Sequence, residues 1–412
     1  MTMVTLTTHL ATVRSPAGKT CVDLFSGAGG FAVGYRQAGW SVVAANDLDS
    51  AAGATFRHNF PESVFFEGAI SSLSVEAILS SCDLKPGDLD CLIGGPPCQS
   101  FSYNNHKRTA DDERAGLFRD YLRIVEGLHP KTIMMENVPG ILTIGSGAVI
   151  DEIRACLGNL GYDVDARVLA AELYGVPQAR RRVFVAATRI GKASDLLPNP
   201  THWLNRLCTD RAGRPIDRPT GDLERIPTVW QAISDLPELR NGEGDHCSTY
   251  GGKQATTKFQ REIRNGSKKL LNHVCSKLGT VNLERMAHIP EGGNWRNIPR
   301  ELLPAGMQRA KLTDHTKRYG RLERSGLAST LLTKCDPHWG AYIHPTQDRT
   351  ISVREAARIQ GFPDTFHFSG NQISYHFEQI GNAVPVQLAK AIALSVGEHI
   401  TDAARVNERS AA

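Results

Sequence analysis

The chain has few of the features that mark membrane, secreted or metal-binding proteins. No run of about 18 apolar residues occurs, and residues 1–15 are rich in threonine instead of carrying an apolar core behind a basic start. The nine cysteines are an odd number and none form Cys-x-x-Cys, so neither a disulfide framework nor a zinc ribbon is indicated. His246, Cys247, His273 and Cys275 match no common ligand spacing, and we predict no metal. We expect a cytoplasmic protein without a membrane span.

The sequence also lacks a large excess of charge of one sign. It has 47 Lys and Arg against 43 Asp and Glu, but residues 191–330 alone hold 23 basic against 15 acidic residues. A basic middle suits a polyanion such as nucleic acid, although by itself it could be only a solvated surface. At 412 residues, 41% of them hydrophobic, the chain is long enough to form two domains.

A strand, a glycine turn and a helix are predicted near the start. Lys19–Phe25 is apolar and favours a strand, Ser-Gly-Ala-Gly-Gly follows at 26–30, and a helix then extends to Gly39. The glycines let a ligand approach the helix N-terminus. They do not complete Gly-x-Gly-x-x-Gly, which counts against a dinucleotide site.

An acidic residue follows the next predicted strand, Trp40–Ala45. A carboxylate in this place commonly binds ribose hydroxyls, and Asp47 is our candidate. Asp49, just before Ser-Ala-Ala, is better suited to capping a helix. Residues 63–70 predict a third strand.

The most informative stretch is Gly-Gly-Pro-Pro-Cys-Gln-Ser-Phe-Ser at 94–102. It follows a short buried strand predicted at 88–93, and the glycines and prolines force the backbone out of the sheet into a stiff loop. Ligands of open α/β sheets bind at the carboxyl ends of the strands, where Cys98 would stand. A lone cysteine is usually structural, but this rigid setting favours a nucleophile.

Partners for this cysteine follow in the sequence. Lys131–Met135 predicts a buried strand that ends at Glu136, and burial would raise the pKa of that acid. Arg180, Arg181 and Arg182 stand between strands predicted at 162–171 and 182–187. A triple arginine is usually a solvated patch, but beside the crevice it can contact phosphate and a base edge.

From residue 190 the apolar periodicity fades until about 324. Loops at 251–253 and 291–296 could reach a groove, and there Trp295 and Arg296 could stack on bases or donate to them, although a tryptophan more often belongs to a core. Order returns with a strand at 329–332, a helix at 352–364 with a serine cap and a glycine stop, and a last helix predicted from Gln379 to about Ile400.

These motifs, in this order, resemble those of the DNA (cytosine-5)-methyltransferase family of the bacterial restriction-modification type. The matching segments are Phe-x-Gly-x-Gly-Gly at 25–30, Pro-Cys-Gln at 97–99, Gln-x-Arg-x-Arg at 178–182, Arg-Glu-x-Ala-Arg-x-Gln-Gly-Phe-Pro at 354–363 and Gly-Asn-Ala-Val at 381–384. The resemblance covers nearly everything except the middle. One departure is Ala69, where the family usually has an aspartate that binds the adenine amino group.

The resemblance implies an α/β fold, with a mostly parallel, Rossmann-like, seven-stranded S-adenosylmethionine-dependent methyltransferase sheet and a smaller, irregular target-recognition domain. The expected domains are 16–190 for catalysis and cofactor, completed by 371–405; 191–350 for target recognition; and 351–370 as a connecting helix and hinge. The helix arginines at 354 and 358 are expected to be structural.

The resemblance also implies the reaction: methyl transfer from S-adenosylmethionine to C5 of a flipped cytosine in duplex DNA. Cys98 would attack C6, Glu136 would assist at N3, Arg182 would hold the base and Arg180 a backbone phosphate. The cofactor residues would be Phe25, Gly27, Gly29, Gly30, Asp47, Leu48, Ile70, Pro97, Asn382 and Val384. We expect a monomer that acts on nucleoid DNA, with any cognate endonuclease acting separately.

Four alternatives stay open at this stage. A nicotinamide oxidoreductase would share the strand, turn and helix, and an adenine-N6 or cytosine-N4 methyltransferase would carry Pro-Pro-Tyr or Pro-Pro-Phe where Cys98 follows Pro97. An RNA methyltransferase of the same family is closer, although the basic middle favours duplex DNA. A non-catalytic DNA-binding protein would not need Cys98, Glu136 and Asn382 together.

Overall fold

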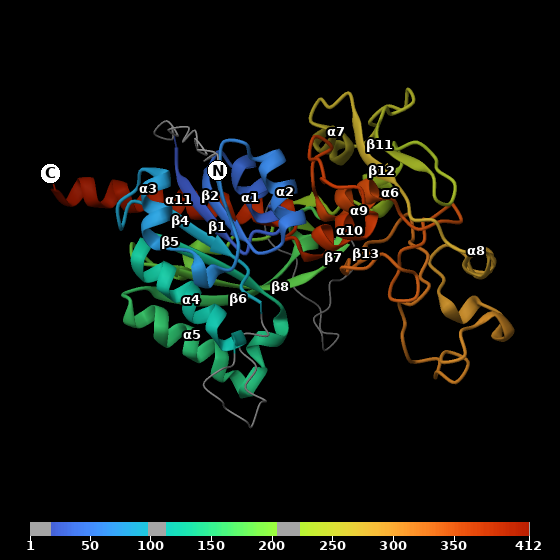
Figure 1. The fold of residues 1–412 in the computed structure, drawn as a ribbon, viewed down its shortest axis with the longest axis horizontal. Coiled ribbons are helices and arrows are strands. Elements are labelled where there is room, and N and C mark those ends of the chain that lie inside the picture. The colour runs from blue at the N-terminus through green and yellow to red at the C-terminus, as the bar shows by residue number, and fades with distance from the viewer. Residues whose placement is uncertain (1–17, 98–112, 204–222, 412) are drawn as a thin grey trace, which may run out of the picture.

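The protein consists of a larger lobe built on a central sheet and a smaller, more irregular lobe beside it (Figure 1). The computed structural model describes residues 18–97, 113–203 and 223–411. The α/β fold with a mostly parallel seven-stranded sheet is confirmed.

The central sheet has the strand order β3-β2-β1-β4-β5-β8-β6. The first five of these strands are parallel, and β8 is antiparallel to both of its neighbours. All seven sheet strands were predicted, with ends displaced by a few residues. Their bounds are β1 Thr20–Leu24, β2 Ser41–Asp47, β3 Val64–Glu67, β4 Cys91–Gly94, β5 Thr132–Asn137, β6 Asp163–Ala170 and β8 Arg181–Thr188.

Helices cover both faces of this sheet (Figure 1). Successive strand side chains point to opposite faces, so Ile93 and Met134 join one apolar core while Leu92 and Met135 join the other. Each fully buried side chain of this size contributes roughly 1.5–3 kcal/mol. The first core contains side chains of α1 Gly30–Gln37, α2 Ser50–Asn59 and α11 Val386–Ala411; the second contains those of α3 Val75–Cys82, α4 Glu113–Leu128 and α5 Ala148–Asn159.

The smaller lobe is made of short elements joined by long loops. Its pairs are β9 His202–Trp203 with β10 Glu224–Arg225, and β11 Gly244–Ser248 with β12 Leu270–Val274; its helices are α6 Val229–Ile233, α7 Lys258–Arg264 and α8 Thr280–Ala287. A parallel pair, β7 Gln178–Ala179 with β13 Ala328–Ser329, links this region to the larger lobe. The 3-10 turns are η1 Ile70–Ser72, η3 Pro139–Leu142, η4 Ile144–Gly147, η5 Ala171–Tyr174, η6 Ala193–Leu196, η7 Trp295–Asn297 and η8 Arg300–Leu302.

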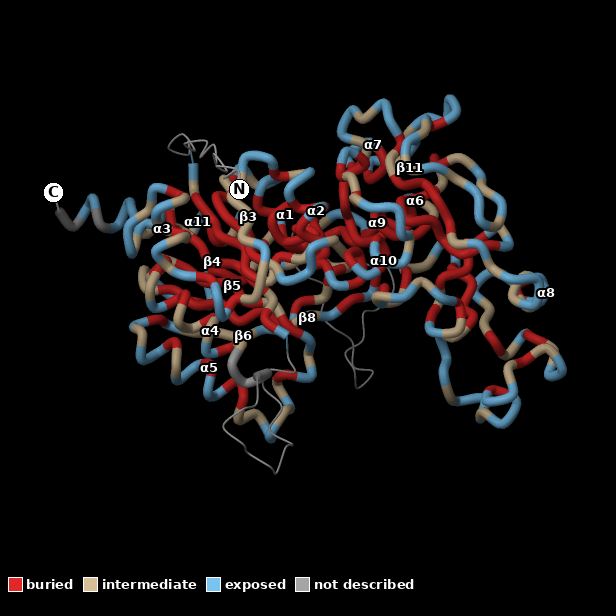
Figure 2. The backbone as a smooth tube through the Cα atoms, in the orientation of Figure 1, coloured by how far each residue is buried: buried red, intermediate tan, exposed pale blue. Residues whose placement is uncertain are grey.

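Helix α9, Val353–Gln360, is buried along its whole length (Figure 2). Its predicted signals are confirmed: Ser352 and Glu355 form a capping box, and Gly361 ends the helix at φ +93°. The left-handed conformation at Gly361 explains the glycine, since a side chain would be strained there.

Two arginines of α9 are fully buried. Arg358 donates to Asp235 at 2.5 Å and to Asp364 at 2.6 Å, and Arg354 donates to the carbonyl of Leu271 at 2.7 Å. Asp235 also accepts from Arg264 of α7 at 2.7 Å. The two side chains therefore connect separate segments of the smaller lobe, as the expected structural role requires.

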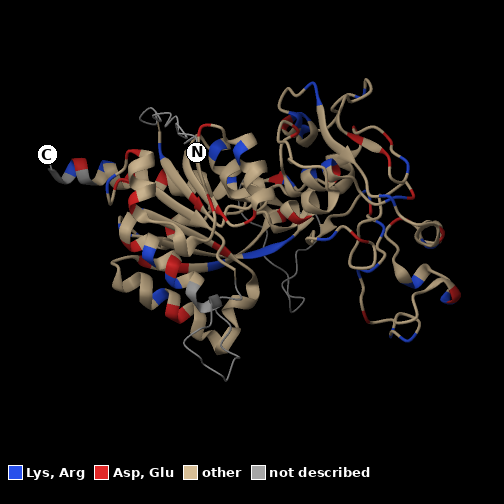
Figure 3. Ribbon diagram, in the orientation of Figure 1, with Lys and Arg blue, Asp and Glu red and all other residues tan. Residues whose placement is uncertain are grey.

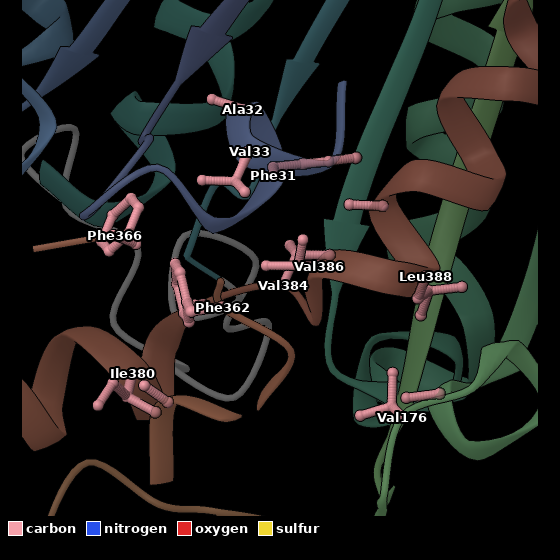
Figure 4. Close-up of a cluster of buried hydrophobic side chains, with 14 of the residues drawn as sticks. Phe31, Ala32, Val33, Val176, Phe362, Phe366, Ile380, Val384, Val386 and Leu388 are labelled. Carbon is pink, nitrogen blue, oxygen red and sulfur yellow. The ribbon is translucent and has the colours of Figure 1, made fainter. Parts of the chain in front are cut away.

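The prediction of one last helix from Gln379 is wrong in detail. Helix α10, Ile373–Asn382, ends where that helix was expected to begin, and α11 starts at Val386. Pro385 lacks an N–H and fixes φ, so it suits the start of a new helix. Figure 4 shows Val384 and Val386 of this junction among the buried side chains that include Phe31 and Phe362. By length and composition the stretch 373–406 could cross a membrane, but 56% of its apolar window is buried inside the protein.

Candidate active site

Four neighbouring strands end together at one edge of the sheet. Leu24 of β1 pairs with Gly94 of β4 and with Asn46 of β2, and Met135 of β5 pairs with the same Gly94. The residues that follow these strand ends therefore meet at one edge, where ligands of parallel α/β sheets bind.

The glycine turn after β1 is tightly wound. Phe25, Gly27 and Gly29 have φ values of +56°, +53° and +96°. A Cβ at Gly29 would lie 2.9 Å from the rings of Phe56 and Phe60, so this glycine is required by packing. A Cβ at Gly27 would meet no atom within 4 Å, so this side of the turn faces open space.

Asp47 fastens the glycine turn to the end of β2. Its carboxylate accepts the N–H of Gly27 at 2.7 Å and the N–H of Asp49 at 2.8 Å. Burial raises the pKa of this carboxyl, and the two N–H groups oppose the rise. Asp49 caps α2 as predicted, by accepting from Ala51. Leu48 is 72% exposed beside Asp47, an apolar surface available to a ligand ring.

Ile70 and Val384, two other predicted cofactor residues, are buried. Ile70 is 2% exposed in the core that covers the α3 and α4 face of the sheet, and its carbonyl accepts from Arg123 at 2.8 Å. The carbonyl of Val384 would lie 2.9 Å from a Cβ at Gly30, so the junction before α11 packs directly on the start of α1. Asn382 is exposed at the end of α10.

The loop after β4 is fixed at its start. The Nδ2 of Asn137 donates to the carbonyl of Pro96 at 2.8 Å, and a Cβ at Gly95 would lie 3.4 Å from Oε2 of Glu136. The loop thus passes against the acid that ends β5. Pro97 is exposed, and Cys98, the predicted nucleophile, lies outside the described residues.

Glu136 and Arg182 form an ion pair at the centre of this edge. The Nε of Arg182 lies 2.8 Å from Oε1 of Glu136, and the two side chains are 15% and 12% exposed, respectively. Burial raises the pKa of the Glu136 carboxyl, and the charges of Arg182 and Arg180 oppose that rise. Figure 3 shows the basic start of β8 that carries Arg182.

Arg180 does not have the role predicted for it. It is 1% exposed and donates to the carbonyl of Leu331 at 3.0 Å and to that of Gly381 at 2.8 Å. A side chain enclosed in this way cannot reach a DNA phosphate, so the expected phosphate contact is wrong for this structure. Arg180 instead joins β7 to the segment after β13 and to α10.

A glutamine pair continues this connection. Gln178 donates to Oε1 of Gln360 at 2.6 Å, and Gln360 donates to the carbonyl of Ala383 at 2.5 Å. Both glutamines are fully buried. Helix α9, strand β7 and the junction before α11 are thereby tied together behind the ion pair.

Two residues of the site were missed by sequence reasoning. Asn137 was visible in Glu-Asn-Val-Pro, but nothing in the sequence showed that its amide would hold Pro96. Asp23, in β1, is 1% exposed, and its Oδ2 has no hydrogen-bond partner among the described residues. Burial raises the pKa of Asp23 well above its usual value, and the charge of Asp47 adds to the rise.

The loop at 291–296 does not present Trp295 at its surface. Trp295 is 3% exposed in the core of the smaller lobe, and Arg296 donates to the carbonyl of Leu312 at 2.5 Å. Of the two possibilities that the sequence left open for Trp295, the core position is the one found, and stacking on bases is excluded. The sequence could not distinguish this tryptophan from an exposed one.

A cavity of about 620 Å³ lies elsewhere, between α7, β10 and α11. In its lining Lys258 pairs with Glu224 and with Glu262, and Glu136, Arg180 and Arg182 are not among the described residues that line it. We place the active site at the sheet edge, because the ion pair, the glycine turn and the fixed loop converge there.

The sheet order and the site together define an α/β methyltransferase, and the comparisons with known proteins specify the kind. The family model described as C-5 cytosine-specific DNA methylase matches residues 19–398, and the chain belongs to this family of DNA (cytosine-5)-methyltransferases. The chain is 33% identical to the type II methyltransferase M.AgeI of Thalassovita gelatinovora, over 91% of this chain and 98% of the relative.

A second type II methyltransferase and two solved structures are also similar to this chain. The type II methyltransferase M.DdeI of Desulfomicrobium norvegicum is 33% identical over 94% of this chain and 90% of its own. A crystal structure from E. coli, provisionally described as a prophage-encoded DNA modification methyltransferase, has a TM-score of 0.69 and 26% identity over 93% of this chain and all of that one. The Spodoptera frugiperda DNMT2 structure, at 17% identity and a TM-score of 0.56 over 92% of this chain and 99% of that one, shares the fold.

Proposed function

We propose that the protein methylates C5 of a cytosine flipped out of a specific site in duplex DNA, through a covalent bond between Cys98 and C6. The observation that carries the proposal is the Glu136–Arg182 ion pair, against which the loop leading to Cys98 is fixed by Asn137. This arrangement supplies an acid and a cation at the place where a base would be held.

Each residue has a role that cytosine chemistry requires. C5 of cytosine is a weak nucleophile until a thiolate adds to C6 and converts the ring to an enamine. Cys98 adds to C6 while Glu136 donates to N3, and Arg182 donates to the ring oxygen. After methylation a base removes the C5 proton and the thiolate leaves. Arg182 also stabilises the thiolate, because a nearby cation lowers the pKa of a cysteine.

The cofactor we propose is S-adenosylmethionine, which supplies an electrophilic methyl group when bound. The residues present fit it: Gly27 faces open space, the unpartnered Oδ2 of Asp23 suits a cationic donor, and Asp47 and the exposed Leu48 suit a ribose and an adenine ring. Asn382 would contact the amino-acid end. Ala69 supplies no acceptor for the adenine amino group, so the apolar contacts must provide more of the affinity.

The proposed substrate is DNA with the target base extruded, because a stacked cytosine hides C6 from any thiol. The type II relatives suggest modification of a specific site within a bacterial restriction-modification system, with any endonuclease acting as a separate protein. We propose a cytoplasmic monomer for this role.

The test uses purified protein, tritiated S-adenosylmethionine and paired DNA and RNA substrates. Wild type should label duplex DNA, bisulfite sequencing should locate the label at one sequence, and DNA carrying 5-fluorocytosine at that site should form a covalent adduct. Labelling of RNA alone, or methylation without any adduct, would overturn the proposal.

A further inference from the structure

One tryptophan of the smaller lobe is strongly exposed. Trp339 is 52% exposed, in an excursion of the chain between Leu332 and Tyr342. The excursion is closed at its base, where the N–H of Leu332 donates to the hydroxyl of Tyr342 at 2.9 Å. At its tip the N–H of Trp339 donates to the carbonyl of Asp336 at 2.9 Å, forming a turn. The backbone that carries the exposed indole is therefore hydrogen-bonded.

The indole is also supported from the core. Tyr319, 3% exposed, packs edge-on against His338 at 5.8 Å, and His338 packs edge-on against Trp339 at 5.2 Å. The N–H of Tyr319 donates to the carbonyl of Pro337 at 2.6 Å. An aromatic series thus leads from a buried ring to an exposed one. Aromatic pairs of this kind are worth about 0.5–1.5 kcal/mol each, enough to restrict where the indole points.

A cation lies against the exposed ring. The guanidinium of Arg318 is 5.2 Å from the centroid of the Trp339 ring. No carboxylate pairs with Arg318 among the described residues, whereas Arg324 nearby in sequence is paired with Glu291 at 2.9 Å. Burial lowers the pKa of His338, the charge of Arg318 lowers it further, and the charge of Asp336 opposes this fall. Arg318 keeps its donors free for a ligand.

The excursion starts beside the active site. The hydroxyl of Thr330 donates to the carbonyl of Ala179 at 2.9 Å, and Arg180 donates to the carbonyl of Leu331 at 3.0 Å. Ala179 and Arg180 lie three and two residues before Arg182, which pairs with Glu136. Trp339 is the seventh residue after Leu332, so the two are at most about 25 Å apart. A group held at Arg182 and a group touching Trp339 can therefore belong to one short stretch of DNA.

We propose that Trp339 and Arg318 read the duplex next to the extruded cytosine, Trp339 by stacking on a flanking base and Arg318 by donating to a base edge. This inference rests on the proposed function and adds the specificity-determining contacts. An arginine can donate to both O6 and N7 of guanine, and an aromatic ring can stack on any base, so the two residues divide recognition into a selective and a general part. The alternative is that the indole merely covers the stem of Arg318.

The experiment compares Trp339→Ala, Trp339→Phe and Arg318→Lys with Tyr375→Ala. Tyr375 is 47% exposed on α10 and serves as the matched control. We expect Trp339→Ala to raise KM for DNA by about tenfold or more, and Trp339→Phe to restore most of the affinity. Arg318→Lys should relax the bisulfite-mapped sequence at one position by about tenfold, since lysine cannot make the same two-point contact.

Cofactor binding and Tm, measured for each variant, confirm that the fold is kept. If Trp339→Ala does not fold, the KM for DNA of Trp339→Phe and the sequence preference of Arg318→Lys test the inference. The inference is overturned if these variants keep the KM and the sequence preference of Tyr375→Ala. Failure of wild type to methylate any duplex would overturn the proposed function instead, so the two failures are distinguishable.

Discussion

Arg182 places its Nε 2.8 Å from Oε1 of Glu136, so the start of β8 and the end of β5 form one functional unit. The two strands are antiparallel neighbours, and Glu136 pairs with Phe184 in the register that brings the side chains together. The geometry of the acid therefore depends on the sheet itself and not on a surface loop.

The first prediction concerns Glu136→Gln. The amide keeps the shape but cannot donate a proton from an acid, so kcat should fall by roughly 10²–10⁴ while DNA and cofactor still bind. Because burial raises the pKa of Glu136, the protonated acid persists to higher pH than in a free glutamate. The pH profile of wild-type kcat should therefore decrease as pH rises through the pKa of Glu136, and the profile of the variant should lack this decrease. Single-turnover rates between pH 5 and 9 check this; an unchanged profile would remove Glu136 from the reaction.

The second prediction concerns Cys98→Ala. Methyl transfer should be lost below detection, whereas S-adenosylmethionine should bind as in wild type, because the glycine turn and Asp47 lie on other strands. Isothermal titration and a tritium assay give the two readouts. Persistent methylation by the purified variant would show that another nucleophile acts.

The third prediction separates Arg180 from Arg182. Arg180→Met leaves the buried carbonyls of Leu331 and Gly381 without their donor and should lower the free energy of unfolding by about 2–5 kcal/mol. The salt dependence of DNA binding should not change, since no phosphate contact is lost. Arg182→Met should instead reduce kcat. If DNA binding by Arg180→Met depended less on salt than binding by wild type, Arg180 would contact a phosphate after all, contrary to the structure.

The fourth prediction uses two glycines of α1 and its turn. Gly27→Ala adds a methyl group to open space at φ +53°, so it should cost about 1–2 kcal/mol and weaken S-adenosylmethionine binding. Gly34→Ala would place its Cβ 2.4 Å from that of Ala389, forcing α1 away from α11 and lowering stability by about 1–3 kcal/mol. Chemical unfolding should show a loss of stability in both variants, whereas calorimetric titration should show weaker cofactor binding in Gly27→Ala only. Equal loss of cofactor affinity in the two would remove Gly27 from the cofactor site.

The fifth prediction is a loss of stability in mild acid. His344 is 3% exposed, and burial lowers its pKa to about 4; its Nδ1 accepts from the N–H of Thr346, and its Nε2 faces Glu355 at 3.6 Å. The other charged or titratable groups near it are Arg349, Arg321 and His273.

Since the folded pKa of His344 lies below the unfolded value of about 6.5, the unfolded chain binds the proton first. The stability present above pH 6.5 is lost as pH falls toward 4, by on the order of 3 kcal/mol. Guanidinium unfolding at pH 7.5 and pH 5 should show about 2 kcal/mol of this loss, and His344→Gln should show less of it. An equal loss in the variant would assign the effect to other groups.

The sequence predicted the larger lobe well because each strand carries its own local signal. Apolar runs such as Lys131–Met135 can be satisfied only in a buried sheet, and the capping box at Ser352 depends on residues three positions apart. The break at Asn382 was missed because the apolar pattern continues through Val384 on both sides of Pro385.

The errors at the site have a different cause. Whether Arg180 faces phosphate or protein depends on Leu331 and Gly381, which lie more than 150 residues away. The contrast between Trp295 and Trp339 likewise depends on tertiary packing, because their short-range sequences give no sign of which indole is covered. Residue type and spacing indicate which chemistry is available, but long-range contacts decide which side chains are free to perform it.

The complete enclosure of α9 limits how specificity can be re-engineered. Exchanging residues 191–350 with a relative would cut the bonds from Arg358 to Asp235 and from Arg354 to Leu271 unless the incoming segment carries the same partners. An unmatched graft would remove Asp235 from Arg358 and leave Asp364 as the carboxylate that faces both buried guanidinium groups. One carboxylate would then balance two buried cations, so most such chimeras should fail to fold before their new target site can be assayed. Evolution of new target sites is therefore expected to be easier in the exposed loops of this segment than at Asp235, which accepts from Arg358 and Arg264.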